Sequence, residues 1–116
     1  MNSSASEGDL RMRFEQNGKE SRADLSGRIT IDSSPEFRAS LLRILRAPDC
    51  QRLEVNFSEV VYIDTSGIAV LMEVLKSARH VGKKLELSGL HDSPRYIFES
   101  TGLLSFFEEA PASSNQ

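Results

Sequence analysis

The chain has 116 residues, which is enough for one domain and too few for two independent hydrophobic cores. Its hydrophobic fraction of 39% and charged fraction of 27% are typical of a globular protein, and no apolar run reaches the ~20 residues that span a bilayer. A net charge of −3 disfavours a nucleic-acid binder, and the single cysteine, Cys50, excludes an intrachain disulfide or a cysteine zinc cluster.

Both ends of the chain are rich in small and polar residues. We therefore expect disordered tails at residues 1–9 and 110–116, around one domain over residues 10–109. The first eight residues lack the basic start and apolar centre of a secretory signal. The expected location is the cytoplasm, without membrane insertion.

The first part of the domain has the pattern of two strands. Residues 11–16 alternate polar and apolar side chains, and Asn17-Gly18 is a strong signal for a two-residue hairpin turn. A second strand is predicted over residues 20–31, with an interruption near Ser26-Gly27. The two strands should pair as a hairpin.

Helices and strands then alternate. A helix is predicted to start at Ser33-Ser34-Pro35-Glu36, where a serine caps and Pro35 suits the first helical position, and to stop at Pro48. The remaining predicted elements are a strand at 53–57, from which residues 61–63 lead into the next helix, a helix at 66–81, a strand at 85–87, a helix from residue 92 to Gly102 and a helical turn at 103–107. This order predicts an α/β domain, a mixed sheet of four to five strands with about four helices packed on it.

The junction before the 66–81 helix is the most informative part of the sequence. An apolar run ends at Asp64, and Thr65, Ser66 and Gly67 follow before the helical pattern begins. On one interpretation Thr65 or Ser66 is only the helix cap, worth about 0.5–2 kcal/mol. On the other, the hydroxyls lie at the carboxyl end of a strand, where functional loops gather in open α/β sheets, and are targets for phosphorylation.

The motifs of common enzymes are missing. Asp64-Thr65-Ser66-Gly67 only superficially matches an aspartic-protease loop, which needs a second carboxylate from another lobe or subunit. His80 should lie roughly 20 Å from Ser66 along the helix, too far to act as its base, and His91 is in a loop. Phosphate-loop, dinucleotide and metal-ligand spacings are absent. We therefore predict a protein that is not an enzyme and has no cofactor or metal.

Three segments resemble the STAS domain, found in bacterial anti-sigma-factor antagonists and in sulphate transporters. These segments are residues 64–71 (DTSGIAVL), 82–90 (GKKLELSGL) and 100–103 (STGL). The resemblance runs from about Leu25 to Phe107, roughly three-quarters of the chain. It implies a sheet of four or five strands with helices packed on it.

The resemblance also implies a function. In this family an antagonist binds an anti-sigma factor that is a serine/threonine kinase, is phosphorylated on the hydroxyl residue after the aspartate, and is reset by a phosphatase. By position the acceptor is Thr65, with Ser66 as the alternative. The partner surface that we predict comprises Asp64, Thr65, Ser66, Gly67, Ile68, Met72 and Asp32. Ile68 and Met72 are expected to stay partly exposed for this purpose.

Two departures from the family pattern leave alternatives open. Serine is the usual acceptor where this chain has Thr65, and the family's second aspartate aligns with Thr30. Asp32 is either a substitute for that aspartate or, as we favour, a cap of the following helix. The alternative functions are a soluble STAS subunit of a lipid ABC transporter and a stressosome-type scaffold module.

Overall fold

The computed structural model describes residues 9–111, so most of both predicted tails lies outside the described residues. Strands and helices occur in the predicted order. The elements are β1 (Arg11–Asn17), β2 (Glu20–Ile29), α1 (Ser34–Arg46), β3 (Arg52–Ile63), α2 (Thr65–His80), β4 (Lys84–Ser88), α3 (Asp92–Ser100), the 3-10 turn η1 (Leu104–Phe106) and β5 (Glu108–Glu109). None of the described helices is long and apolar enough to cross a membrane.

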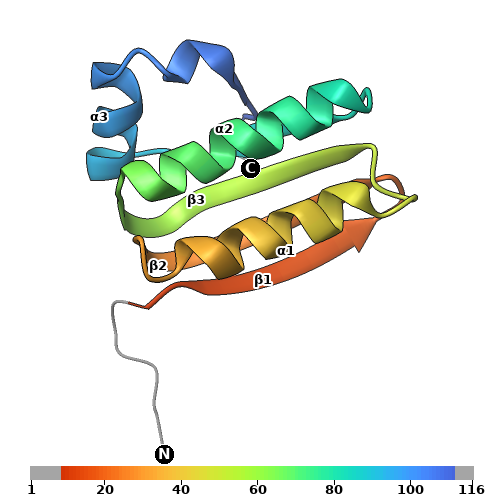
Figure 1. Ribbon diagram of the computed structural model, residues 1–116, viewed down its shortest axis with the longest axis horizontal. Coiled ribbons are helices and arrows are strands. Elements are labelled where there is room, and N and C mark those ends of the chain that lie inside the picture. The colour runs from red at the N-terminus through yellow and green to blue at the C-terminus, as the bar shows by residue number, and fades with distance from the viewer. Residues whose placement is uncertain (1–8, 112–116) are drawn as a thin grey trace, which may run out of the picture.

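The strands form one mixed sheet in the order β1-β2-β3-β4-β5. β1 is antiparallel to β2, whereas the other neighbouring pairs are parallel. The helices α1 and α2 lie side by side over one face of the sheet, and α3 lies near the end where α2 begins (Figure 1). The predicted α/β class and mixed sheet are confirmed.

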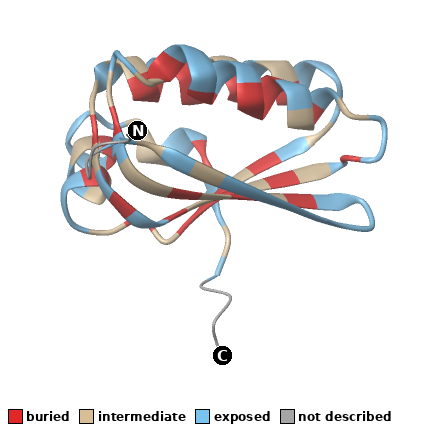
Figure 2. Ribbon diagram, turned by 90° about the horizontal axis from the view of Figure 1, so that it is seen from below, coloured by how far each residue is buried: buried red, intermediate tan, exposed pale blue. Residues whose placement is uncertain are grey.

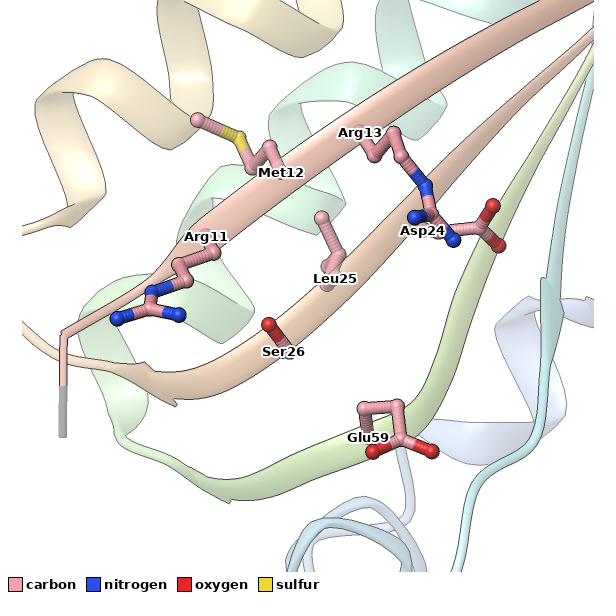
Figure 3. Close-up of a pocket in the computed structure, with 7 residues that line it drawn as sticks. All are labelled: Arg11, Met12, Arg13, Asp24, Leu25, Ser26 and Glu59. Carbon is pink, nitrogen blue, oxygen red and sulfur yellow. The ribbon is translucent and has the colours of Figure 1, made fainter. Parts of the chain in front are cut away.

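The two faces of the sheet differ in polarity. On the face toward α1 and α2, alternate residues of β2 and β3 such as Leu25 and Val55 join the hydrophobic core, and the perpendicular view shows buried helical residues turned to the sheet (Figure 2). The opposite face carries charged side chains in cross-strand contacts, including Arg22 with Glu15 at 2.9 Å. It holds a pocket of about 350 Å³ beside Asp24 (Figure 3). No described helix packs there, so this face relies on polar contacts.

The structure corrects three boundaries. β3 has 12 residues and extends the predicted 53–57 strand without a break to Ile63, because register shifts against β2 around Leu25 and at Gly27/Arg28 absorb extra residues without ending the strand. The hairpin loop is Gly18-Lys19, since Asn17 still pairs with Glu20. The two-residue β5 was not predicted, because so short a segment carries no alternation.

Gly89 joins β4 to α3 and is packed against β3. Its φ is +70°, and a Cβ there would lie 2.7 Å from the Ser58 nitrogen and 2.8 Å from Asn56 Oδ1. Gly18 in the β1–β2 turn has a similar φ of +65°, but a Cβ there would meet nothing within 4 Å. Substitution of Gly18 would therefore test backbone strain alone, whereas substitution of Gly89 would add steric overlap to that strain.

Gly18→Ala is expected to lower the free energy of unfolding by about 1–2 kcal/mol, because a residue with a side chain is strained in the left-handed backbone conformation. Gly89→Ala should cost roughly 1–3 kcal/mol more, because its Cβ also overlaps fixed backbone. Urea unfolding of both variants measures the difference. Equal losses would contradict the close approach of Gly89 to β3.

Candidate functional site

Asp64 caps α2. It has an extended backbone, and its Oδ1 accepts hydrogen bonds from the N–H of Ser66 at 2.9 Å and of Gly67 at 3.3 Å. Thr65 is already the first helical residue. The prediction that Thr65 or Ser66 caps this helix is therefore wrong, because the cap is the residue before them and its carboxylate reaches the free N–H groups first.

The same carboxylate also holds the loop that follows β2. Its Oδ2 accepts the N–H of Ile31 at 3.1 Å, and the Asp64 N–H donates to the Ile29 carbonyl at 3.0 Å. Burial alone would raise the pKa of Asp64, but hydrogen bonds from Ser66, Gly67 and Ile31 outweigh it and hold the pKa below the ordinary 3.8. Asp64 is thus an ionised link between two loops.

Ser66 is committed to internal contacts. Its hydroxyl donates to Asp64 Oδ1 and lies 2.7 Å from the hydroxyl of Ser34, the first residue of α1. The Ser34 hydroxyl also contacts the Thr30 carbonyl at 2.8 Å. This chain of contacts fixes the starts of both helices against the end of β2.

Thr65 differs from its neighbours. Its side chain is exposed, and within residues 9–111 its hydroxyl has no hydrogen-bond partner. It lies at a groove of about 580 Å³ along α2, whose lining includes Ala69, Met72, Thr101 and Leu103. A free hydroxyl therefore stands beside a largely apolar hollow.

Gly67 and Ile68 form the packed side of this helix start. A Cβ on Gly67 would lie 2.7 Å from Ile29 Cγ2 and 2.8 Å from Ile63 Cγ1, so only a glycine fits without a shift of these two side chains. Ile68 is only 5% exposed, which contradicts its expected partial exposure, because it joins the core beneath α2. Met72, one turn later, is partly exposed and lines the groove.

Asp32 is exposed in the loop before α1, and its carboxylate makes no hydrogen bond within the described part of the chain. The prediction that Asp32 caps α1 is wrong, since the cap position belongs to Ser33. The Ser33 hydroxyl does not bond the N–H groups of α1 either; it accepts from the Thr30 N–H at 3.0 Å. The loop is therefore stabilised locally rather than by a helix cap.

Two residues of the site were missed by the sequence prediction. Ile31 is 71% exposed beside Asp64, and an apolar residue between a strand and a helix start gave no signal of exposure. Ser34 was assigned to helix initiation, whereas its hydroxyl contacts Ser66. The side chain of His91 is engaged elsewhere: its ring nitrogens contact Asp92 and the Ser58 carbonyl.

Comparison with known proteins decides the family. The family model described as "Mlab, STAS domain" matches residues 12–106, which is most of the chain. The chain belongs to the STAS domain family. Over 84 residues it is 30% identical to the anti-sigma-B factor antagonist of Listeria monocytogenes, covering 72% of this chain and 73% of that protein.

Solved structures agree with the fold of this STAS protein. An anti-sigma factor antagonist from Mycobacterium paratuberculosis matches with a TM-score of 0.82 and 17% identity, covering 93% of this chain and 91% of that one. The Bacillus cell fate determinant SpoIIAA in its phosphorylated form matches with a TM-score of 0.69 and 16% identity over 89% and 94% of the two chains. At these identities the likeness establishes the shared fold.

Asp64→Asn is expected to lower the free energy of unfolding by about 1–3 kcal/mol at pH 7, because charged hydrogen bonds become neutral. Because the pKa of Asp64 in the folded state is lower than 3.8, the stabilisation by its charge is fully present above pH 3.8. This stabilisation is lost as the pH falls through the folded-state pKa. The difference between wild type and variant should therefore shrink in acid.

Urea unfolding between pH 7 and pH 2 measures this difference. Asp32→Asn is the matched control, since its exposed carboxylate lacks such bonds among residues 9–111, and it should change stability by less than about 0.5 kcal/mol. A pH-independent effect of Asp64→Asn would show that the charge of Asp64 is not what stabilises the junction.

Proposed function

We propose that this STAS protein is an anti-sigma-factor antagonist, a binding protein whose hold on an anti-sigma kinase is switched by phosphorylation of Thr65. The observation that carries the proposal is the contrast between adjacent residues. Thr65 presents an exposed hydroxyl without a hydrogen-bond partner in residues 9–111, whereas Asp64 and Ser66 are committed to the fold. The similarity to anti-sigma-B factor antagonists supports the same role.

Ser66 is the weaker acceptor candidate. Phosphorylation there would remove the hydroxyl proton from its bond to Asp64 and break the contact with Ser34. It would also place a charge of about −1.5 to −2 against the Asp64 carboxylate. Like unit charges about 4 Å apart cost roughly 4 kcal/mol near a protein surface, so this product would strain the junction.

A phosphate on Thr65 would stay at the surface. The N–H groups of Ser66 and Gly67, which would otherwise attract an anion to the helix start, already serve Asp64. The added charge therefore changes what a partner meets rather than how the chain folds. A phosphatase would find the same group exposed and could reset the protein.

The proposed partner surface surrounds Thr65. On one side the exposed Ile31 and Asp32 follow β2, and on the other the groove runs past Met72. Apolar contacts next to a hydroxyl suit a partner that loses affinity when the hydroxyl becomes a dianion, since the charge would then be desolvated. Gly67 and Ile68 support this surface from beneath.

A second candidate is the soluble STAS subunit of a lipid ABC transporter, which would dock on an ATPase subunit without phosphorylation. The observation that favours it is the largely apolar groove beside a threonine rather than the usual serine. Purification of the chain from its own cells separates the candidates: a stoichiometric transporter ATPase supports the second, and a kinase supports the first. Recovery in a large homogeneous assembly would instead support a scaffold module.

Thr65→Ala should abolish phosphate incorporation from ATP by the cognate serine/threonine kinase, because it removes the acceptor. Thr65→Ser is the matched control and should be phosphorylated. Ser66→Ala should still be phosphorylated, at a stability cost of about 1 kcal/mol for the lost hydrogen bonds. Intact-mass spectrometry reads the result, and equal incorporation by wild type and Thr65→Ala would refute the assignment.

Phosphorylation should weaken binding of the purified protein to that kinase by about a hundredfold, which corresponds to roughly 2.7 kcal/mol. Isothermal titration with the unmodified and the phosphorylated protein measures the change. Thr65→Glu should weaken binding in the same direction but less, because it adds one charge instead of two. Unchanged affinity after full phosphorylation would mean that Thr65 lies outside the contact.

A further inference from the structure

β1 forms a long open edge of the sheet. Its seven residues pair with β2 in an unbroken register, without a bulge or a proline. At the other edge, β5 has only two residues, and the Ala110 N–H is bonded to the Leu87 carbonyl. Proteins blunt exposed edges with prolines, bulges, short strands or charged side chains, because unpaired backbone groups there attract another strand. Of these protections, β1 carries only charged side chains, Arg11, Arg13 and Glu15.

The side chains of β1 are arranged to match a second copy of themselves. We propose that two copies of this chain associate through antiparallel pairing of their β1 strands, about a twofold axis at Phe14. In this register all seven residues pair, and each Arg13 lies opposite the partner copy's Glu15. Such opposite charges directly across an antiparallel pair are stabilising, and like charges there are destabilising.

Other symmetric registers are worse. Centring on Arg13 keeps an Arg11–Glu15 pair on each side of the axis, but it places Arg13 against its own copy and pairs only five residues. Centring on Glu15 places Glu15 against its own copy. A centre at Met12 opposes Arg11 and Arg13, and a centre at Gln16 pairs only three residues. The charge pattern of β1 therefore selects one register, which is what an isologous interface requires.

The charged groups are available for these contacts. Arg13 lies opposite Asp24 on the charged face of the sheet (Figure 3), and its guanidinium has no ion-pair or hydrogen-bond partner within residues 9–111. Glu15 bonds Arg22 at 2.9 Å and still has a side chain that is 58% exposed. Because Arg22 also pairs with Asp24 at 3.1 Å, Arg13 of a second copy would complete a network of four charges on each side of the axis.

The apolar side of β1 is also open. Phe14 is 37% exposed, and the contacts of α1 with the sheet are mainly with β2 and β3. Pairing would bring the two Phe14 side chains together at the axis. The axis is perpendicular to the sheet, so the two Thr65 sites would lie at opposite ends of a joined sheet, and both would stay accessible. The inference is independent of the proposed function.

Sedimentation velocity of the full chain up to about 1 mM tests the proposal. The mass should rise from 12.9 kDa toward twice that value with concentration. Arg13→Glu and Glu15→Arg should each weaken association at least about tenfold, because each opposes like charges at both pairs. A one-to-one mixture of the two variants should dimerise again, since a glutamate of one variant then faces an arginine of the other at both pairs.

Arg11→Glu is the matched control, since it makes the same charge change on the same strand but faces the neutral Asn17, and it should dimerise like wild type. Recovery in the mixture also shows that both single variants are folded. A wild-type mass that stays at 12.9 kDa at every concentration overturns the proposal. The β1 edge would then be open to pairing with a strand of another protein. Dimers of Arg13→Glu as tight as wild type, or a mixture that stays monomeric, overturn it as well.

Discussion

The carboxylate of Asp64 is the interaction on which the rest of the site depends. It satisfies two N–H groups at the start of α2 and the N–H of Ile31, so one ionised side chain fixes the helix start relative to the loop after β2. Without it, the N–H groups of Ser66 and Ile31 would lack partners within residues 9–111, whereas the Gly67 N–H would keep its bond to the Asp64 carbonyl at 3.1 Å. Because Asp64 and Ser66 make the hydrogen bonds that hold this junction together, the fold does not depend on the hydroxyl of Thr65.

This division of roles means that the proposed modification of Thr65 would not weaken the fold. The core beneath α2 comes from residues such as Leu71 and Val74, which are fully buried, and the close approach of Gly67 to Ile29 and Ile63 holds the helix on the sheet. None of these contacts involves the Thr65 side chain. Charge added there acts on the surface, whereas charge added at Ser66 would act on the packing.

Much of the fold could be predicted because local signals agree with it. The hairpin, the alternation of helices and strands, and the extent of the 66–81 helix, observed as Thr65–His80, follow from turn chemistry and periodicity. The cap was not predictable, because Asp64, Thr65 and Ser66 are all good caps and only the backbone angles decide among them. The burial of Ile68 and the exposure of Ile31 depend on neighbours that are distant in sequence.

The position of Thr65 at the very start of α2 has a kinetic consequence. The Thr65 hydroxyl is exposed and has no hydrogen-bond partner within residues 9–111, so the proposed addition or removal of a phosphate would require no local unfolding of the chain. The lifetime of each signalling state would then be set by the rates and amounts of the two opposing enzymes. Such a domain would respond as quickly as these enzymes act, because its own rate of unfolding would not limit the response.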